Sequence, residues 1–194
     1  MSRLLLRELL VYEDSNYLAL NKPAGLSTLH DRQDDRNLLA IIRSEHPDAM
    51  VAHRLDKETS GVLVVALHAE AYRHISGLFE GRLVEKIYHA VAQGTPDYKM
   101  QEVDAPILKL ADGTVKISRQ GKPSLTHFNT LERFSRHSLV EALPVTGRTH
   151  QIRIHLSLLG TPIAGDIQYG GETVMLSGLK RRYKPSRNTR EEGE

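Results

Sequence analysis

The sequence predicts an α+β fold with a mixed, mostly antiparallel sheet and flanking helices. Four β-rich segments, at 103–110, 115–118, 124–134 and 138–145, follow one another without a long helix between them. Strands joined by short turns pair antiparallel, since parallel neighbours need a long crossover connection. Apolar residues recur at spacings of three and four over 69–79, which predicts one amphipathic helix. Runs of strands separated from helices in this way are typical of α+β domains.

Composition places the chain among globular proteins. It has 194 residues, of which 40% are hydrophobic, and this suits one domain with a substantial core. We expect the domain to cover 1–178, followed by a flexible basic tail at 179–194. The net charge is only +2, so nucleic-acid binding would depend on local clusters of basic residues. The absence of cysteine excludes disulfides and thiolate metal sites and fits a reducing compartment, so we expect a cytoplasmic protein.

The first half of the chain begins with a short strand and a turn. Residues 17–22 are predicted to form the strand, and the Pro-Ala-Gly sequence at 23–25 stops it. Lys22 therefore lies at a strand end beside a loop. Asn37 can cap a following helix, which ends at Pro47.

The central motif is a charged segment that runs directly into an apolar strand. Residues 53–61 read His-Arg-Leu-Asp-Lys-Glu-Thr-Ser-Gly, and 62–67 form an apolar run that we expect to be buried on both faces of a sheet. Arg54 and Asp56 are two residues apart, so in an extended segment their side chains share one face. The two residues could be a structural ion pair or part of a site, because ion-pair networks and functional sites both place charges near a core.

A second strand carries further candidate residues. The segment 85–92 is β-rich, and its period of two places Lys86, Tyr88 and Ala90 on one face. It follows the predicted helix at 69–79, for which Gly81 is the expected stop.

A third segment joins a basic loop to a short helix. Apolar residues at spacings of four and three predict a helix that ends at Gly160, with Thr149 as its N-cap. Arg148 then precedes the helix N-terminus, where a positive charge is unfavourable for the helix dipole. We therefore expect Arg148 to pair with an anion. The Gly- and Pro-rich residues 161–171 predict a structured loop.

Metal and membrane sites are disfavoured. His150 and His155 are five apart, whereas two ligands on one helix face are four apart, so neither a zinc site nor a metal-dependent hydrolase is expected. The apolar run near the N-terminus is interrupted by charge after three residues, which predicts neither a signal peptide nor a membrane span.

Five short motifs are spread along the chain in a fixed order. They are Leu-Asn-Lys-Pro-Ala-Gly-Leu at 20–26, His-Arg-Leu-Asp-x-x-Thr-Ser-Gly at 53–61, Glu-Lys-Ile-Tyr-His-Ala at 85–90, Gly-Arg-Thr-His-Gln-Ile-Arg at 147–153 and Pro-Ile-Ala-Gly-Asp-x-x-Tyr-Gly at 162–170. This set resembles the signature of the RluA-type pseudouridine synthases, a family that isomerises uridine in ribosomal and transfer RNA. An ordered set of motifs is stronger evidence than any single one.

The resemblance implies a fold, a chemistry and a set of residue roles. The fold is the pseudouridine synthase fold with a central RNA-binding cleft, and the reaction needs no metal or cofactor. Asp56 matches the catalytic aspartate, Tyr88 the active-site tyrosine, and Arg148 the arginine that pairs with the aspartate. Arg54 matches the residue that helps to displace the target base from its stack. By composition alone, Tyr88 could instead be a core aromatic.

Structured RNA, ribosomal or transfer, is the partner that the resemblance implies. We expect no membrane or DNA partner, and a monomer. Lys22, Lys86, Arg153 and the basic tail could hold phosphates, although exposed basic side chains often form only a solvated surface.

Two departures from the family pattern bear on activity. Many members carry an N-terminal S4 RNA-binding domain, whereas here the pattern begins at Leu20, so we expect that domain to be absent. Members usually continue past the Tyr-Gly loop into further strands, so we expect the chain to be short at its C-terminus. A protein that binds or folds RNA without turnover is therefore the alternative to an enzyme.

Overall fold

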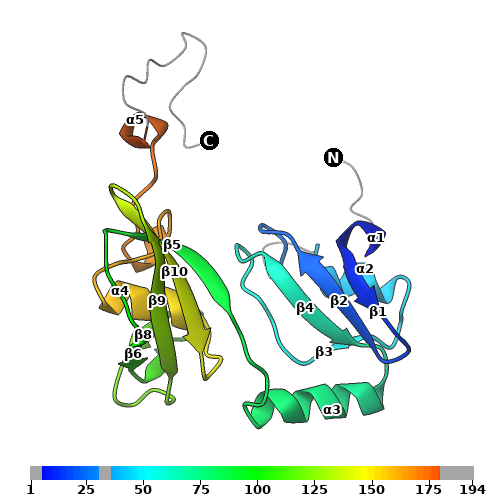
Figure 1. The fold of residues 1–194 in the computed structure, drawn as a ribbon. Helices are drawn as coiled ribbons and strands as arrows, with labels where there is room; N and C mark the ends of the chain where they lie inside the picture. The colour runs from blue at the N-terminus through cyan, green and yellow to red at the C-terminus, as the bar shows by residue number, and fades with distance from the viewer. Residues whose placement is uncertain (1–5, 31–35, 180–194) are drawn as a thin grey trace. The chain divides into compact units, whose positions relative to one another are not determined.

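A computed structural model describes residues 6–30 and 36–179 of the chain (Figure 1). The chain divides into two compact units, Met1–Val84 and Glu85–Glu194, and each has its own sheet and helices. Apart from Leu179, the predicted basic tail lies outside the described residues.

The first unit is built on a four-stranded antiparallel sheet in the order β1-β2-β4-β3. Its strands are β1 (Leu10–Glu13), β2 (Tyr17–Lys22), β3 (Met50–Val51) and β4 (Gly61–Ala66). The strand predicted at 17–22 is confirmed, and the one predicted at 62–67 begins and ends one residue earlier. Lys22 pairs with Gly61, so the end of β2 lies beside the start of β4.

β4 is not buried on both faces as its composition predicts. Leu63 and Val65 have no exposed surface, whereas Val62 is 58% exposed. The prediction is wrong because an apolar run alone does not distinguish a parallel strand, covered on both faces, from an antiparallel strand whose alternate side chains point to opposite faces of its sheet.

Three helices complete the described part of the first unit: α1 (Leu6–Leu9), α2 (Leu38–Arg43) and α3 (Ala69–Glu80). Asn37 caps α2 as predicted, since its side-chain oxygen accepts a hydrogen bond from the Ala40 N–H at 2.9 Å. The helix predicted at 69–79 is confirmed as α3, which ends at Gly81 and packs against β3 and β4 (Figure 1).

The second unit contains a four-stranded sheet in the order β5-β10-β9-β6 and a separate hairpin of β7 and β8. Its strands are β5 (Tyr88–Gln93), β6 (Gln101–Asp104), β7 (Ile107–Lys109), β8 (Val115–Ile117), β9 (Leu125–Arg133) and β10 (His137–Pro144). The single strand predicted at 103–110 is interrupted at Ala105 and Pro106, because proline has no N–H to donate to a neighbouring strand. Throughout the described ranges, the named strands pair antiparallel, which agrees with the predicted fold class.

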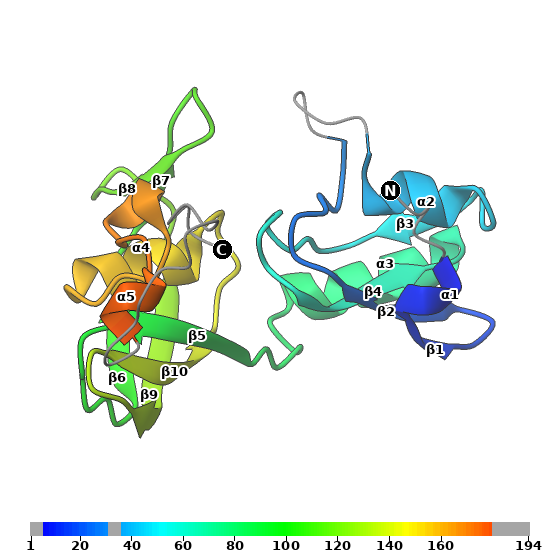
Figure 2. The ribbon, with the colours of Figure 1, turned by 90° about the horizontal axis from the view of Figure 1, so that it is seen from above.

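One longer helix, α4 (Gln151–Leu158), packs against the second sheet and is followed by the 3-10 helix η1 (Ile167–Tyr169) and by α5 (Leu176–Leu179). Both views show α4 lying along one face of the sheet (Figures 1 and 2). Leu156 of α4 joins Phe128 and Val140 in the core of this unit. The predicted end at Gly160 is confirmed, but the residue that precedes the helix is His150 rather than Thr149.

Candidate functional site

Asp56 lies on the loop between β3 and β4, next to a residue that is anchored in the core. Leu55 is buried, and its backbone bonds twice to the hydroxyl of Thr28. That hydroxyl donates to the Leu55 carbonyl at 2.9 Å and accepts from the Leu55 N–H at 3.3 Å. Arg54 is exposed and Asp56 is half-buried, so these two side chains alternate with the anchored residue, as expected for an extended segment.

His53 is a second anchor of the same loop. Its Nε2 accepts a hydrogen bond from the Val64 N–H in β4 at 3.0 Å, and its ring stacks on Phe79 of α3 with centroids 4.4 Å apart. The sequence assigned no chemistry to His53, and these contacts give it a structural role in holding the loop to the sheet.

Lys22 is the third anchor. Its side chain has no exposed surface, and its ammonium donates to the carbonyl oxygens of Pro23, Leu26 and Lys57 at 2.8, 2.7 and 3.1 Å. The prediction that Lys22 holds an RNA phosphate does not fit these contacts, because its donors already face backbone carbonyls. A position at a strand end beside a loop is equally suitable for an internal cation that ties the loop down.

The charge of Lys22 is influenced by two carboxylates of the anchored loop. Burial lowers the pKa of the ammonium, and the negative charges of Glu58 and Asp56 act in the opposite direction without cancelling that effect. Lys22 and Asp56 are therefore electrostatically coupled within the first unit.

The turn predicted at 23–25 completes the anchoring. Gly25 adopts a φ of +80° and donates its N–H to the Lys57 carbonyl at 2.9 Å. A side chain at this φ would be strained, which is why the turn needs glycine. Backbone on both sides of Asp56 is thus fixed by residues distant in the sequence.

Tyr88 begins β5 in the second unit, opposite Ala142 of β10. It is half-buried and packs against the core cluster that contains Phe128 and Leu156. Lys86 precedes the strand, and its ammonium donates to the Thr146 carbonyl at 3.3 Å. The ring position is compatible with both interpretations of Tyr88, as a packing residue and as a residue that presents its hydroxyl at a site.

Arg148 lies on the loop between β10 and α4, as predicted. It is half-buried, and its Nε donates to the Pro123 carbonyl at 3.1 Å. Its backbone N–H donates to the side-chain oxygen of Gln151 at 2.9 Å.

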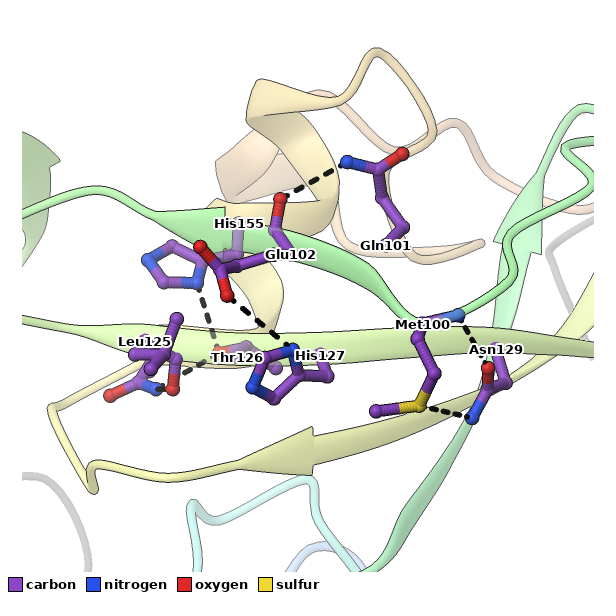
Figure 3. Close-up of polar contacts among 9 residues, drawn as sticks. Met100, Gln101, Glu102, Leu125, Thr126, His127, Asn129 and His155 are labelled. Carbon is purple, nitrogen blue, oxygen red and sulfur yellow. Dashed lines mark hydrogen bonds and ion pairs between the residues drawn. The ribbon is translucent and has the colours of Figure 1, made fainter.

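Sequence reasoning missed a group of buried polar residues behind Arg148: Thr126, Thr146, Gln151 and His155. Figure 3 shows the imidazole of His155 directed at the Thr126 hydroxyl, with which it forms a 3.0 Å hydrogen bond. Gln151 donates to the same hydroxyl at 2.9 Å. Gln151 and His155 are four residues apart, so their occurrence on the otherwise apolar face of a helix was the available signal.

Arg153 is engaged inside the second unit. Its guanidinium makes a bidentate ion pair with Asp166 at 2.6 and 2.7 Å, donates to Gln168 at 3.0 Å and lies 4.8 Å from the centre of the Tyr169 ring. The Asp166 side chain is only 9% exposed. The prediction of a phosphate contact does not fit this geometry, which instead fixes the Gly-rich loop after α4.

In 6–30 and 36–179, no group of three or more His, Asp or Glu side chains is placed to hold a metal ion. His150 bonds to the Tyr169 hydroxyl at 2.7 Å, and both ring nitrogens of His155 are bonded. Over the same ranges, no helix is long and apolar enough to span a membrane.

Comparison with known proteins identifies relatives that share both units. The model of the RNA pseudouridylate synthase family matches residues 16–158. "Ribosomal large subunit pseudouridine synthase C" of Vibrio cholerae is 41% identical over 169 residues, which cover 85% of this chain and 54% of that protein. The protein of the same name from Pasteurella multocida is 40% identical over 189 residues, covering 92% and 58%. The chain thus spans about half the length of these curated relatives.

Solved structures agree with this relationship. Human RNA Pseudouridylate Synthase Domain Containing 1 superposes with a TM-score of 0.73 at 33% identity, over 88% of this chain and 73% of that chain. Human RNA Pseudouridylate Synthase Domain Containing 4 gives 0.70 at 30% identity, over 84% and 69%. The chain therefore belongs to the RNA pseudouridylate synthase family, as its resemblance to the RluA-type enzymes predicted.

Proposed function

We propose that this chain isomerises specific uridines of structured ribosomal or transfer RNA to pseudouridine, with Asp56 as the catalytic carboxylate. Family membership supports the reaction, and the names of the bacterial relatives favour ribosomal RNA as the first substrate to test. The observation that carries the proposal is the anchoring of the Asp56 loop by Lys22, Thr28 and His53.

The reaction explains why a carboxylate should be held in this way. The bond from the sugar C1′ to N1 of uracil breaks, a bond from C1′ to C5 forms, and the hydrogen on C5 is lost as a proton while N1 gains one. There is no net oxidation, so no redox group is needed. Whether Asp56 attacks C1′ or removes the proton on C2′, its carboxylate must be placed beside one sugar, and a fixed loop reduces the entropy cost of that placement.

Tyr88 and Arg148 are proposed as the other two catalytic residues of the reaction. The Tyr88 ring would pack on the uracil and its phenol would serve in proton transfer. Arg148 would pair with the Asp56 carboxylate and keep it ionised. Arg148 lies on a loop before a helix, and binding and catalytic residues occur disproportionately on loops held by a rigid scaffold, which supports its role.

RNA contact is proposed for Arg54 and Lys86. The target uridine must leave its stack before a carboxylate can reach its sugar, and the exposed Arg54 could occupy the vacated position. Lys86 lies just before β5 and is half-buried, and the positive charge of its ammonium would attract an RNA phosphate. Lys22 and Arg153 are proposed to hold loops in place instead of contacting RNA.

The test is tritium release from RNA labelled at uracil C5, with ribosomal and transfer RNA in separate reactions. We expect release by the wild-type chain and none by Asp56→Ala. Glu45→Gln is the matched control, because it removes a carboxylate at an exposed position of the same unit, outside the Asp56 loop, and should leave release intact. RNA binding by a folded chain without release from either RNA would favour the alternative, a protein that binds or folds RNA without turnover.

The same proposal includes a cytoplasmic, monomeric enzyme that acts on RNA and not on DNA. An RNA substrate and the absence of cysteine support the location. Sedimentation of the free protein and a DNA competitor in the tritium assay test the remaining two statements.

A further inference from the structure

Four polar side chains are buried between α4 and the second sheet, where apolar packing is the default. Thr126 and His155 have no exposed surface, and Gln151 and Thr146 are 4% and 6% exposed. Buried polar groups are tolerated when they are hydrogen-bonded, and each of these four is. Figure 3 shows the Thr126 end of this group, on the face of β9 that α4 covers.

The hydrogen positions among these four side chains follow from the Ala105 carbonyl oxygen, which can only accept a hydrogen bond. Nε2 of His155 lies 3.1 Å from the Ala105 carbonyl oxygen, so the ring carries its hydrogen on Nε2. Burial lowers the pKa of His155, which keeps the ring neutral and leaves Nδ1 as an acceptor. The Thr126 hydroxyl, 3.0 Å away, must therefore donate to Nδ1.

This donation determines the orientation of Gln151. With its hydrogen directed at His155, the Thr126 oxygen accepts from the Gln151 amide nitrogen at 2.9 Å. The other hydrogen of that nitrogen is donated to the Leu125 carbonyl at 2.9 Å. The amide oxygen must then point the other way, because the flipped amide would place its oxygen against the Leu125 carbonyl.

The oxygen of Gln151 faces the Arg148 loop. It accepts from the Thr146 hydroxyl at 2.7 Å and from the Arg148 N–H at 2.9 Å, while the Gln151 N–H donates back to the Arg148 carbonyl at 3.1 Å. This reciprocal pair, three residues apart, has the geometry of the glutamine half of a capping box. It encloses His150, whose φ of +52° is unusual for a residue with a side chain.

We propose that Gln151 is the positioning residue for Arg148, and that Thr126 and His155 hold Gln151 in the only orientation that accepts the Arg148 N–H. The inference rests on the proposed function for the role of Arg148 in turnover, but the positioning itself is a property of the free protein. The buried Gln151 amide fixes the loop backbone from which the Arg148 guanidinium extends. Pairing with a carboxylate requires such a fixed position.

The first experiment measures amide hydrogen exchange at Arg148 by NMR in the full chain without RNA. Thr126→Val keeps the shape of the side chain and removes the hydroxyl. We expect it to accelerate exchange at Arg148 at least tenfold relative to the amides of β10, and Thr126→Ser to restore protection. Thr130→Val is the matched control, since Thr130 lies on the same strand and its hydroxyl donates to the Pro96 carbonyl and accepts from the Tyr98 N–H instead of bonding to Gln151.

Unchanged protection of Arg148 in Thr126→Val, or equal acceleration in Thr130→Val, would overturn the proposal, because the group would then serve core stability alone. If Thr126→Val does not fold, the proposal is tested instead by determining which ring nitrogen of His155 carries the hydrogen in the wild-type chain. Long-range proton–nitrogen correlation should place the hydrogen on Nε2, and a hydrogen on Nδ1 would overturn the assignment.

A kinetic experiment tests the consequence for turnover. In the tritium assay, Thr126→Val and Gln151→Met should lower kcat at least tenfold with KM changed by less than about threefold, and Thr126→Ser should recover kcat. Loss of protection at Arg148 with wild-type kcat would overturn the kinetic part. If the wild-type chain releases no tritium, the proposed function fails, while the exchange result still decides the positioning.

Discussion

The ammonium of Lys22 lies 3.1 Å from the carbonyl oxygen of Lys57, the residue that follows Asp56. This bond joins the end of β2 to the loop that carries the proposed catalytic carboxylate, and it is one of three that the buried ammonium donates. A cation in this position stabilises the loop in two ways, by satisfying backbone carbonyls and by attracting the nearby carboxylates. The motif lysine is therefore best understood as part of the loop's scaffold.

Lys22→Met should destabilise the protein without changing how its RNA affinity depends on salt. Buried carbonyl oxygens left without a donor cost about 1–3 kcal/mol each, so the free energy of unfolding should fall by at least about 2 kcal/mol. Denaturant titration measures this, with the exposed Lys109→Met as control. A lysine that contacts an RNA phosphate would behave differently, because its removal lowers the slope of log K against log salt by about 1.

Tyr88→Phe should slow the loss of the C5 hydrogen while leaving the fold intact. The ring and its packing on the core are kept, and only the hydroxyl is removed. Proton transfer by a positioned group contributes roughly 100-fold or more, so tritium release under single-turnover conditions should fall by about that factor. Tyr98→Phe, in the same core cluster, is the control and should release tritium at the wild-type rate. Equal rates for Tyr88→Phe and the wild type would reduce Tyr88 to a packing residue.

Arg148→Ala should abolish most turnover with a smaller effect on stability. Removing one member of a buried ion pair costs about 3–5 kcal/mol, which corresponds to roughly a hundredfold to several thousandfold in rate if the pair forms in the RNA complex. The comparison is with Arg136→Ala, an exposed arginine in the turn between β9 and β10. Undiminished tritium release by Arg148→Ala would contradict a pair with Asp56.

The sequence could predict the start of α2, the turn at 23–25 and the Asp56 loop, because each of them depends on a local pattern. Asn37 before an apolar run identifies a helix start, and the Pro-Ala-Gly turn at 23–25 requires the positive φ found at Gly25. The functions of Lys22 and Arg153 could not be read in the same way. A basic residue in a motif looks the same in sequence whether it faces a phosphate or a carbonyl, and only tertiary contacts with Lys57 and Asp166 separate the two.

The hydrogen-bond partners of buried polar residues could not be predicted from the sequence either. Thr126 and Gln151 are 25 residues apart in the sequence and belong to a strand and a helix, so no local period connects them. Strand alternation places Thr126 on the same face of β9 as Phe128, and both side chains are buried. It does not predict the partner, because that depends on where α4 crosses the sheet.

His155 should make the protein less stable as the pH falls. Burial lowers its pKa below the ordinary value of 6.5, and the Ala105 carbonyl and the charge of Asp104 oppose this only in part. Between the lowered pKa and 6.5, the unfolded chain binds more protons than the folded one. The contribution of His155 to the free energy of unfolding should therefore be constant above this window, fall as the pH falls through it, and level off below the folded-state pKa.

Urea denaturation at a series of values between about pH 5 and pH 8 measures this contribution, because histidine is the side chain that titrates in that range. His155→Gln should lower stability at neutral pH, since the bonds to Thr126 and Ala105 change, but it should remove the part of the slope that His155 contributes. His89→Gln, at an exposed position of β5, should keep that slope. A His155→Gln chain whose stability follows the wild-type pH dependence would show that the His155 imidazole is not the titrating group. The inference that the His155 ring is neutral, and therefore accepts from the Thr126 hydroxyl, would then lose the support of its pKa.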